Sequence, residues 1–187
     1  MVYVTSDLHF SHNKPFLYEP RGFSSPKEHN EEIVRKWNLM ISDDDEVYIL
    51  GDLIMSDNED AMKYLSQLKG KIYFIRGNHD TDTKIALYKS LGFTDLGYAH
   101  IIKSGKWSFY LSHYPTAVGN YDDEETHKKF YCLCGHTHTA DRWKDFNTMK
   151  SYHVELDAHD NFPVTIEQIK MEIQDYTPAK KEIKCYV

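Results

Sequence analysis

Residues 71–80, KIYFIRGNHD, determine how the rest of the chain can be interpreted. The first half, residues 71–75, is an apolar run of β-branched and aromatic side chains, which is typical of a buried strand. Gly77 then permits a sharp turn, and an amide, an imidazole and a carboxylate follow at residues 78–80. Such side chains can bind a metal or transfer protons, but they also favour turns and helix N-caps. Both interpretations stay open for this stretch alone.

Two earlier stretches repeat the order of a strand followed by polar residues. Residues 2–6 are the first expected strand, with Asp7 and His9 after it, and residues 46–50 are the second, with Asp52 after it. Because residues two apart in an extended chain point the same way, Asp7 and His9 can approach one ion together. The carboxyl ends of strands are also where open α/β sheets place their ligands.

Helix signals separate these strands. Ser25-Pro26-Lys27-Glu28 combines an N-cap serine, a proline at the first helical position and a glutamate that closes a capping box. A second capping box runs from Ser56 to Glu59, and a third helix is expected over residues 82–91. The apolar stripe of the first helix is Ile33, Val34, Trp37, Met40 and Ile41. Alternating strands and helices predict parallel βαβ units with helices on the sheet faces.

The second half of the chain is richer in strands. The expected strands cover residues 98–103, 106–112, 131–134 and 152–157. His113 follows one of them, and Gly-His-Thr-His follows another at residues 135–138. A last helix begins at Thr165, and the tail, residues 174–187, is placed as an edge strand. Because no repeat or linker interrupts the pattern, we expect one domain over residues 1–187.

Composition restricts the class of protein. The chain has 187 residues, a formal net charge of −7 and a pI near 5.8, which argues against stable nucleic-acid binding. A phosphate substrate remains compatible, because bound cations can dominate a local site. Three cysteines, with no signal peptide or membrane span expected, favour reduced thiols and a cytoplasmic protein without membrane association.

Eight polar residues end the expected strands: Asp7, His9, Asp52, Asn78, His79, His113, His136 and His138. Mixed carboxylate and imidazole donors suit Mn, Fe, Zn, Co or Ni, whereas Mg and Ca prefer oxygen ligands. Eight residues are too many for one ion but sufficient for two ions that share a carboxylate. His136 and His138, two residues apart on a strand face, can each reach one ion of such a pair.

Five motifs occur in a fixed order between residues 7 and 138: Asp-x-His, Gly-Asp, Gly-Asn-His-Asp, His and Gly-His-Thr-His. Together they resemble the calcineurin-like metallophosphoesterase superfamily, and residues 7–13 are similar to its small bacterial and phage members. The resemblance implies a four-layer α/β/β/α sandwich, with two mixed β-sheets flanked by helices and the metal site at strand carboxyl ends. Residues 53–55 depart from the Asp-Arg-Gly pattern of the phosphatase branch, which argues against a protein phosphatase.

The resemblance also implies a set of metal ligands. The first ion would be held by Asp7, His9, Asp52 and His138, and the second by Asp52, Asn78, His113 and His136. Two divalent ions would be the cofactors, with manganese as the first expectation and iron, zinc, nickel or cobalt as alternatives. Two such ions, two aspartates and a bridging hydroxide leave a charge of about +1, which attracts phosphate.

The implied reaction is hydrolysis of a phosphate ester. The metal-bridging hydroxide would attack phosphorus, and His79, as imidazolium, would protonate the leaving oxygen as general acid. Asp80 would either orient His79 or cap the next helix. The short chain leaves little room for a cap over the site, which favours a small phosphodiester of the nucleotide or cyclic nucleotide class.

Several alternatives accompany this interpretation. A phosphomonoesterase and a non-catalytic scaffold on the same fold are both compatible with parts of the sequence, and the oligomeric state is not indicated. His12, Arg21, Arg76 and Tyr114 are candidate substrate contacts, each with a structural or surface role as the alternative. Residues 157–160, Asp-Ala-His-Asp, also end a strand, but the ligand set leaves no vacancy for them, so they line the pocket rim or form a turn.

Overall fold

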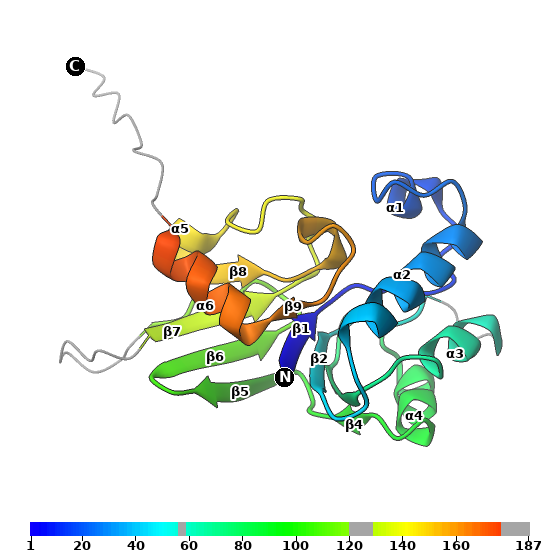
Figure 1. Ribbon diagram of the computed structural model, residues 1–187, viewed down its shortest axis with the longest axis horizontal. Helices are drawn as coiled ribbons and strands as arrows, with labels where there is room; N and C mark the ends of the chain where they lie inside the picture. The colour runs from blue at the N-terminus through cyan, green and yellow to red at the C-terminus, as the bar shows by residue number, and fades with distance from the viewer. Residues whose placement is uncertain (56–58, 120–128, 177–187) are drawn as a thin grey trace, which may run out of the picture.

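The computed structural model describes residues 1–55, 59–119 and 129–176, which form two β-sheets packed against each other (Figure 1). The five-stranded sheet has the order β4-β3-β2-β1-β9, and the four-stranded sheet has the order β5-β6-β7-β8. The first sheet consists of β1 (Val2–Thr5), β2 (Glu46–Leu50), β3 (Lys71–Ile75), β4 (Thr94–Asp95) and β9 (Val164–Thr165). The second consists of β5 (Ala99–Ser104), β6 (Trp107–Ser112), β7 (Lys129–Cys134) and β8 (Ser151–His153).

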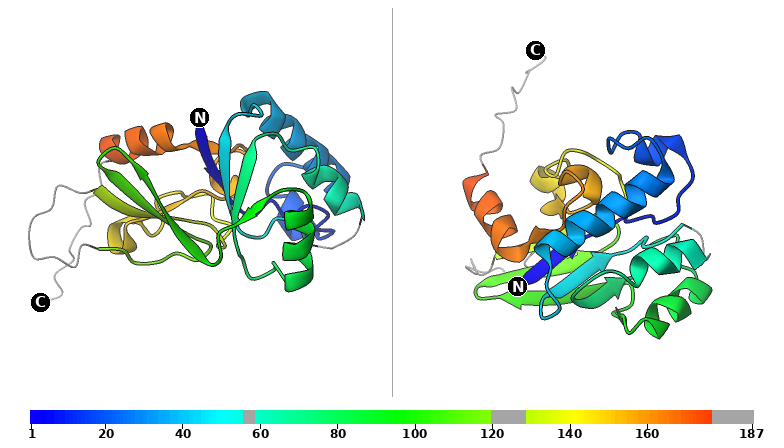
Figure 2. Two further views of the ribbon diagram at one scale, coloured as in Figure 1. Left: turned by 90° about the horizontal axis from the view of Figure 1, so that it is seen from below. Right: turned by 45° about the vertical axis from the view of Figure 1, so that its right-hand side comes forward.

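The helices flank these two sheets. They are α1 (Pro15–Tyr18), α2 (Pro26–Met40), α3 (Glu59–Leu65), α4 (Asp82–Ser90), α5 (Phe146–Met149) and α6 (Ile166–Asp175). Strands β1 to β4 are parallel and adjacent in chain order, so right-handed crossovers place α2, α3 and α4 on one face of their sheet (Figure 2). Strand β9 is antiparallel to β1, and β5 is antiparallel to β6, which makes both sheets mixed. The expected architecture of two mixed sheets flanked by helices is confirmed.

Two hydrophobic clusters explain this arrangement. The first lies between the five-stranded sheet and α2 to α4, where Trp37 is fully buried and donates from Nε1 to the Lys69 carbonyl at 2.9 Å. The second joins the two sheets and the inner side of α6: Val4, Leu50, Ile75, Phe109, Leu111, Leu133, Ile166, Ile169 and Ile173. Strands β1, β2 and β3 are therefore packed on both faces, and this core holds their carboxyl ends in place.

The helix signals are realised with small shifts. Ser25 accepts from the Glu28 amide at 3.1 Å as expected, but the Glu28 carboxylate accepts from the Ser24 amide, one residue before the cap. Met40, placed in the apolar stripe of α2, is 36% exposed because the helix ends there. Thr165 caps α6 by accepting from the Gln168 amide at 3.1 Å.

Short elements account for the other differences. The strand expected over residues 152–157 is wrong in its second half, because β8 ends at His153 and a 3₁₀ helix, η1, covers Leu156–Ala158. The elements α1, α5, β4 and β9 have two to four residues each, too few to produce a periodic pattern. Ser56 of the second capping box and most of the expected tail strand lie outside the described residues. Within the described ranges, no helix has the length and apolar character required to cross a bilayer.

Candidate metal centre

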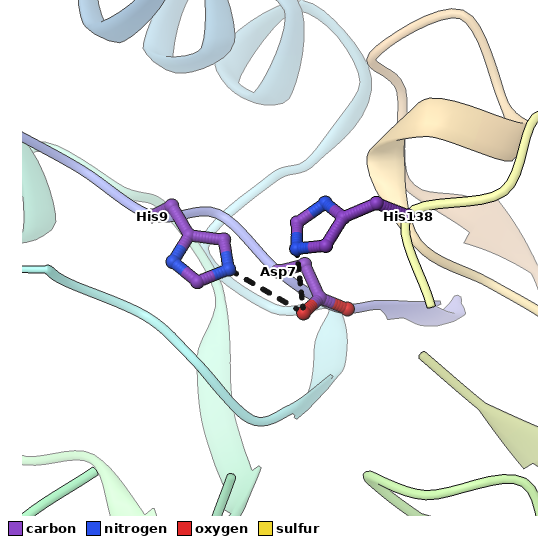
Figure 3. A group of neighbouring side chains, drawn as sticks. All are labelled: Asp7, His9 and His138. Carbon is purple, nitrogen blue, oxygen red and sulfur yellow. Dashed lines mark ion pairs between the residues drawn. The ribbon is translucent and has the colours of Figure 1, made fainter. Parts of the chain in front are cut away.

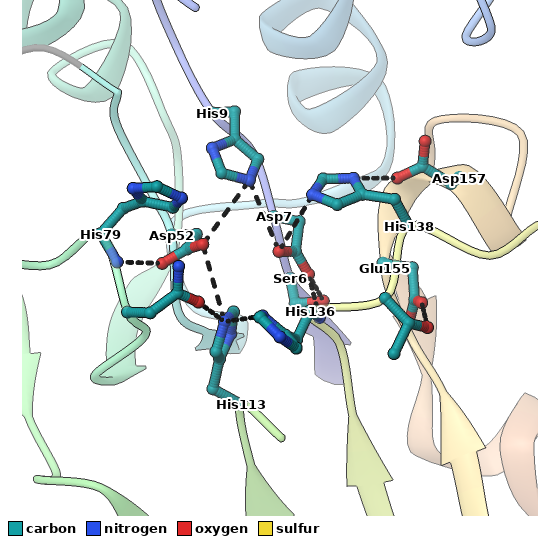
Figure 4. A network of polar contacts seen from close by, with 12 residues as sticks. Ser6, Asp7, His9, Asp52, His79, His113, His136, His138, Glu155 and Asp157 are labelled. Atoms are coloured by element: carbon teal, nitrogen blue, oxygen red, sulfur yellow. Dashed lines mark hydrogen bonds and ion pairs between the residues drawn. The ribbon is translucent and has the colours of Figure 1, made fainter. Parts of the chain in front are cut away.

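Six of the seven expected metal ligands meet where the two sheets present their strand ends: Asp7, His9, Asp52, His113, His136 and His138 (Figure 4). The seventh, Asn78, joins them with its Oδ1 2.8 Å from His113 Nε2. Asp7 and His9 follow β1, Asp52 follows β2, Asn78 follows β3, His113 follows β6, and His136 and His138 follow β7. Both sheets thus contribute donors to one centre. This placement agrees with the expectation from strand order.

The backbone at these ligands is left-handed rather than extended. The φ angles are 58° at Asp7, 49° at His9, 57° at Asp52, 73° at His136 and 48° at His138. The argument that residues two apart point together along a strand is therefore wrong for both histidine motifs, since the chain has already left its strand. Each such residue costs about 1–2 kcal/mol, and strain of this kind concentrates at functional sites.

Backbone contacts and glycines hold these turns together. The Asp7 amide donates to the Gly51 carbonyl at 3.1 Å, and the His9 amide donates to the Asp52 carbonyl at 3.0 Å. A Cβ atom on Gly77 would overlap the carboxylate of Asp52, and one on Gly135 would overlap that of Asp7. Glycine is therefore required in both motifs to let a neighbouring carboxylate approach the backbone.

The first donor group contains Asp7, His9 and His138 (Figure 3). Asp7 Oδ1 lies 3.5 Å from His9 Nε2 and 3.7 Å from His138 Nε2, while Asp7 Oδ2 accepts from the Ser6 hydroxyl at 2.6 Å and the His136 amide at 2.9 Å. Asp7 Oδ1 and His9 Nε2, which face each other, are both buried without a hydrogen-bond partner among the described residues. Because such atoms are costly when unpaired, their convergence fits a bound cation.

The second donor group lies around His113. His113 Nδ1 donates to the Leu50 carbonyl at 2.8 Å, so Nε2 carries the lone pair, and Asn78 Oδ1 faces that nitrogen at 2.8 Å. His136 Nδ1 is 3.2 Å from the same atom. Two acceptor atoms that face each other without a proton fit a cation between them.

The two groups share carboxylates. Asp52 Oδ2 is 3.6 Å from His9 Nε2 and 3.6 Å from His113 Nε2, so it lies between the groups. One carboxylate oxygen of Asp7 also lies within 4.8 Å of ligand atoms of Asp52 and His113. Asp52 therefore lies between the two groups with Asp7 near both, and the mixed oxygen and nitrogen donors fit divalent transition metals.

The protonation states at neutral pH also favour a cation. Burial lowers the pKa of His9 to about 4, although the nearby Asp7 carboxylate opposes this shift. Burial raises the pKa of Asp7, but His9 and the nearby His113 and His138 together lower it below its usual range. Burial raises the pKa of Asp52 to about 6, and His113 partly offsets this. The centre thus presents a neutral imidazole between two carboxylates.

The two residues expected to act on the substrate side have different surroundings. His79 donates its amide to Asp52 Oδ1 at 2.9 Å, and its partly exposed ring lies 5.6 Å from the ring of His9. Both roles considered for Asp80 are wrong. Its carboxylate accepts from the amides of Asp52 and Gly77, both at 2.8 Å, and from Tyr88, and α4 is capped by Thr81 instead. Asp80 therefore joins the turn at residues 51–52 to the turn at residues 77–78.

Neither arginine is available as a substrate contact. The side chain of Arg21 is 1% exposed, and its guanidinium binds Asp157 through Nε at 3.1 Å and Nη2 at 2.7 Å. Arg76 binds Asp95 in the same bidentate manner, at 3.1 and 2.6 Å. The expectation that these cations reach the substrate is corrected, because each is already paired with a carboxylate.

His12 and Tyr114 do lie beside the centre. The ring of His12 is 5.6 Å from that of His9, and its Nδ1 is buried with no hydrogen-bond partner in the described part of the chain. Tyr114 is 48% exposed, and its ring packs at 4.6 Å from His136 and 5.1 Å from His113. One candidate contact therefore borders each donor group.

A buried polar network behind the Gly-His-Thr-His turn was missed. Glu155 is fully buried and accepts from the Thr137 hydroxyl at 3.1 Å and the Thr139 amide at 3.2 Å. His153 lies between Glu155 at 3.1 Å and Asp145 at 2.9 Å. The signal that could have revealed it is His153 and Glu155 between the apolar residues of the strand expected from residue 152. This network supports the turn that carries His136 and His138.

Comparisons with known proteins agree with the fold and the motifs. The family model of the calcineurin-like phosphoesterase superfamily domain matches residues 1–154. Uncharacterized protein MJ1445 of Methanocaldococcus jannaschii is 46% identical over 81 residues, which cover 42% of this chain and 46% of that protein. The match thus spans about half the length of that relative. The Gene 66 protein of Mycobacterium phage L5 is 26% identical over 84% of this chain and 86% of its own length.

The structural comparison supports the arrangement of the sheets. A protein of unknown function from Aquifex aeolicus, AQ665, superposes with a TM-score of 0.71 and 23% identity, over 91% of this chain and 98% of that chain. At that identity the likeness concerns the fold alone. The fold is therefore shared over almost the full length of both proteins.

Proposed function

Because the chain belongs to the calcineurin-like phosphoesterase superfamily, we propose that it is a dinuclear, metal-dependent phosphodiesterase for small nucleotide or cyclic nucleotide esters. Family membership supports a metal-dependent phosphoesterase. The observation that carries the dinuclear proposal is the position of Asp52 Oδ2, 3.6 Å from a ring nitrogen of each donor group. One carboxylate between two nitrogen-rich groups is the arrangement that two neighbouring cations require.

The proposed ligands follow from the two donor groups. Asp7, His9, Asp52 and His138 would hold one divalent ion, and Asp52, Asn78, His113 and His136 would hold the other. Manganese is the proposed metal, with iron, zinc, nickel or cobalt as alternatives. Bound divalent ions would supply hydroxide at neutral pH and stabilise negative charge on the phosphoryl oxygens.

We propose His79 as the general acid. The hydrogen bond from its backbone amide to Asp52 Oδ1 fixes the backbone beside the centre, while its partly exposed ring remains accessible to a substrate. A protonated imidazole at this position can donate to the leaving oxygen as the ester bond breaks. His12, whose ring also lies 5.6 Å from that of His9, would contribute a hydrogen bond to a phosphoryl oxygen.

The substrate class rests on the exposed rim of the centre. Tyr114 is 48% exposed and packs against two ligand rings, which provides an aromatic surface for a nucleobase. The side chain of His138 is 34% exposed, so the centre is open on that side as well. An open centre accommodates the two substituents of a diester. We expect no stable nucleic-acid complex, since the chain carries a net charge of −7.

We place the protein in the cytoplasm because of its thiols. Cys132 and Cys134 are buried on β7 and form no disulfide within the described residues, and the third cysteine lies outside them. Buried thiols of this kind are typical of a reducing compartment.

Hydrolysis of bis-p-nitrophenyl phosphate with Mn²⁺ tests the proposal. We expect turnover by the wild type, slower turnover of p-nitrophenyl phosphate, and at least a roughly 10³-fold loss in Asp52→Asn, since a shared ligand supplies several kcal/mol of stabilisation. Glu172→Gln is the control, because its described partners are Arg142, Tyr152 and Gln168.

The other outcomes separate the alternatives. Faster turnover of the monoester would identify a phosphomonoesterase. Tight Mn²⁺ binding without hydrolysis of either ester would favour the scaffold interpretation. Equal activity of Asp52→Asn and wild type would contradict the dinuclear proposal.

A further inference from the structure

Asp157 is outside the proposed ligand set, yet its carboxylate contacts a ligand. Asp157 Oδ2 lies 3.1 Å from His138 Nδ1, and the opposite ring nitrogen, Nε2, faces Asp7 Oδ1 at 3.7 Å (Figure 4). Arg21 Nη2 also lies 3.3 Å from His138 Nδ1, but its two hydrogens are donated to Asp157 and to the Asp7 carbonyl at shorter distances. An ionised carboxylate can only accept a hydrogen bond, so the proton between Asp157 and His138 belongs to Nδ1. The lone pair of His138 is then on Nε2, the atom that faces the first donor group.

Arg21 determines where this carboxylate points. Its Nε and Nη2 donate to the two oxygens of Asp157, at 3.1 and 2.7 Å, and Nη2 also donates to the Asp7 carbonyl at 2.9 Å. The side chains of Arg21 and Asp157 are 1% and 11% exposed, so the pair is shielded from water. A planar guanidinium with two parallel hydrogen bonds leaves its partner almost no rotational freedom.

The same contacts explain why Asp157 is not itself a ligand. Both of its oxygens are occupied by Arg21, and Oδ2 additionally faces His138. Its position after a strand and its residue type made it resemble a ligand in the sequence. Asp157 therefore acts on the centre through its contact with His138.

We propose that Asp157 and Arg21 are a positioning pair that fixes the tautomer and ring orientation of His138 for the ion held with Asp7 and His9. This inference rests on the proposed dinuclear function. Carboxylates that accept from the distal nitrogen of a metal-binding histidine raise its basicity, and their loss costs about 10- to 100-fold in metal affinity. The effect should concern one ion, because the pair contacts the first donor group.

A purely structural role makes a different prediction. Arg21 also links the loop before α2 to the turn after η1, since its carbonyl accepts from the Asn161 side chain at 3.0 Å. If the pair only joined these segments, its loss would lower stability and weaken both ions to the same extent. The relative affinity of the two ions therefore distinguishes positioning from structural support.

Calorimetric titration of metal-free protein with Mn²⁺ tests the pair. We expect two ions on the wild type, and in Asp157→Asn a roughly 10- to 100-fold weaker affinity for one ion with the other unchanged. Electron paramagnetic resonance at a Mn²⁺ concentration that fills both wild-type sites should change from a coupled to a mononuclear spectrum. Glu172→Gln, which removes a carboxylate bound by Arg142 at 3.1 and 2.9 Å, should keep both affinities.

Each remaining outcome decides against a specific statement. If Asp157→Asn binds both ions with wild-type affinity, or if its affinity for both ions falls to the same extent, the positioning role is overturned. A wild-type protein that binds no Mn²⁺ would refute the proposed function, and this inference with it. Should Asp157→Asn not fold, Arg21→Lys keeps the buried charge but loses the bidentate contact, and the same selective weakening is expected.

Discussion

At the scale of single residues, His79 can be separated from its neighbours. Its backbone amide holds Asp52, whereas only its side chain is assigned to proton transfer, so His79→Ala should keep both ions and the fold. General acid catalysis contributes about 10²- to 10⁴-fold, and its loss matters most for poor leaving groups. We expect a loss of this size on an alkyl diester and a smaller one on bis-p-nitrophenyl phosphate, measured as kcat with Mn²⁺.

An exposed histidine provides the control for this prediction. His100→Ala on β5 removes the same side chain from the surface and should leave both rates unchanged. Unchanged alkyl diester turnover in His79→Ala would remove the general acid from the proposed mechanism.

Residue types at strand ends predicted which residues meet at the candidate centre, but not the partners of the other charged groups. Asp80, Arg21 and Asp157 have side chains that suit a metal or a phosphate, yet each is bound by a group distant in the sequence. Whether a carboxylate faces a metal ion or an arginine depends on tertiary contacts, which no local sequence pattern contains. The pattern at strand ends therefore located the candidate ligands, but it could not show which neighbouring charges are already paired.

At the scale of elements, the Gly-His-Thr-His turn depends on the buried Glu155. Glu155→Gln should destabilise the protein by about 3–5 kcal/mol, because His153 loses a buried charged partner. It should also weaken Mn²⁺ binding, because a neutral oxygen accepts weaker hydrogen bonds than a carboxylate. The second effect follows because Glu155 holds the turn through Thr137 and Thr139. Urea unfolding and Mn²⁺ titration measure the two effects separately.

The other partner of His153 supplies a matched control. Asp145→Asn removes the carboxylate on the far side of the same ring, at 2.9 Å from Nε2. This variant should lose stability while keeping its Mn²⁺ affinity. If Glu155→Gln also kept the wild-type affinity, the turn would not need this support.

Element boundaries were predictable where a strand or helix is long enough to show its period. The parallel strands β1, β2 and β3 are continuous apolar runs because they are buried on both faces, and α2 and α6 begin at capped residues. The turns that hold the ligands were not predictable, because positive φ angles at aspartate and histidine arise from contacts between loops. Local sequence therefore located the centre without giving its geometry.

At the scale of the whole molecule, buried histidines make stability depend on pH. Burial lowers the pKa of His159 to about 4, against about 6.5 in an unfolded chain, so the unfolded state binds the proton more readily. The stability contributed by neutral His159 is complete above pH 6.5 and is lost as the pH falls towards 4. We expect the wild type to lose about 3 kcal/mol more than His159→Gln between pH 7 and pH 4.

Urea unfolding at several pH values measures this difference. The glutamine can still donate to the His153 carbonyl, which accepts from His159 Nε2 at 2.9 Å. Burial lowers the pKa of His153, but Glu155 and Asp145 raise it more, so its own contribution has the opposite sign and is present in both proteins. Parallel stability curves for the wild type and His159→Gln would show that His159 is not buried in its neutral form.

The division of the ligands between the two sheets has a consequence for biosynthesis. Asp7, His9, Asp52 and Asn78 leave the ribosome before His113, His136 and His138, and each proposed ion takes ligands from both of these sets. A nascent chain therefore has no complete site until the second sheet has docked. The proposed ions would therefore be bound late in maturation, after the two sheets have packed together.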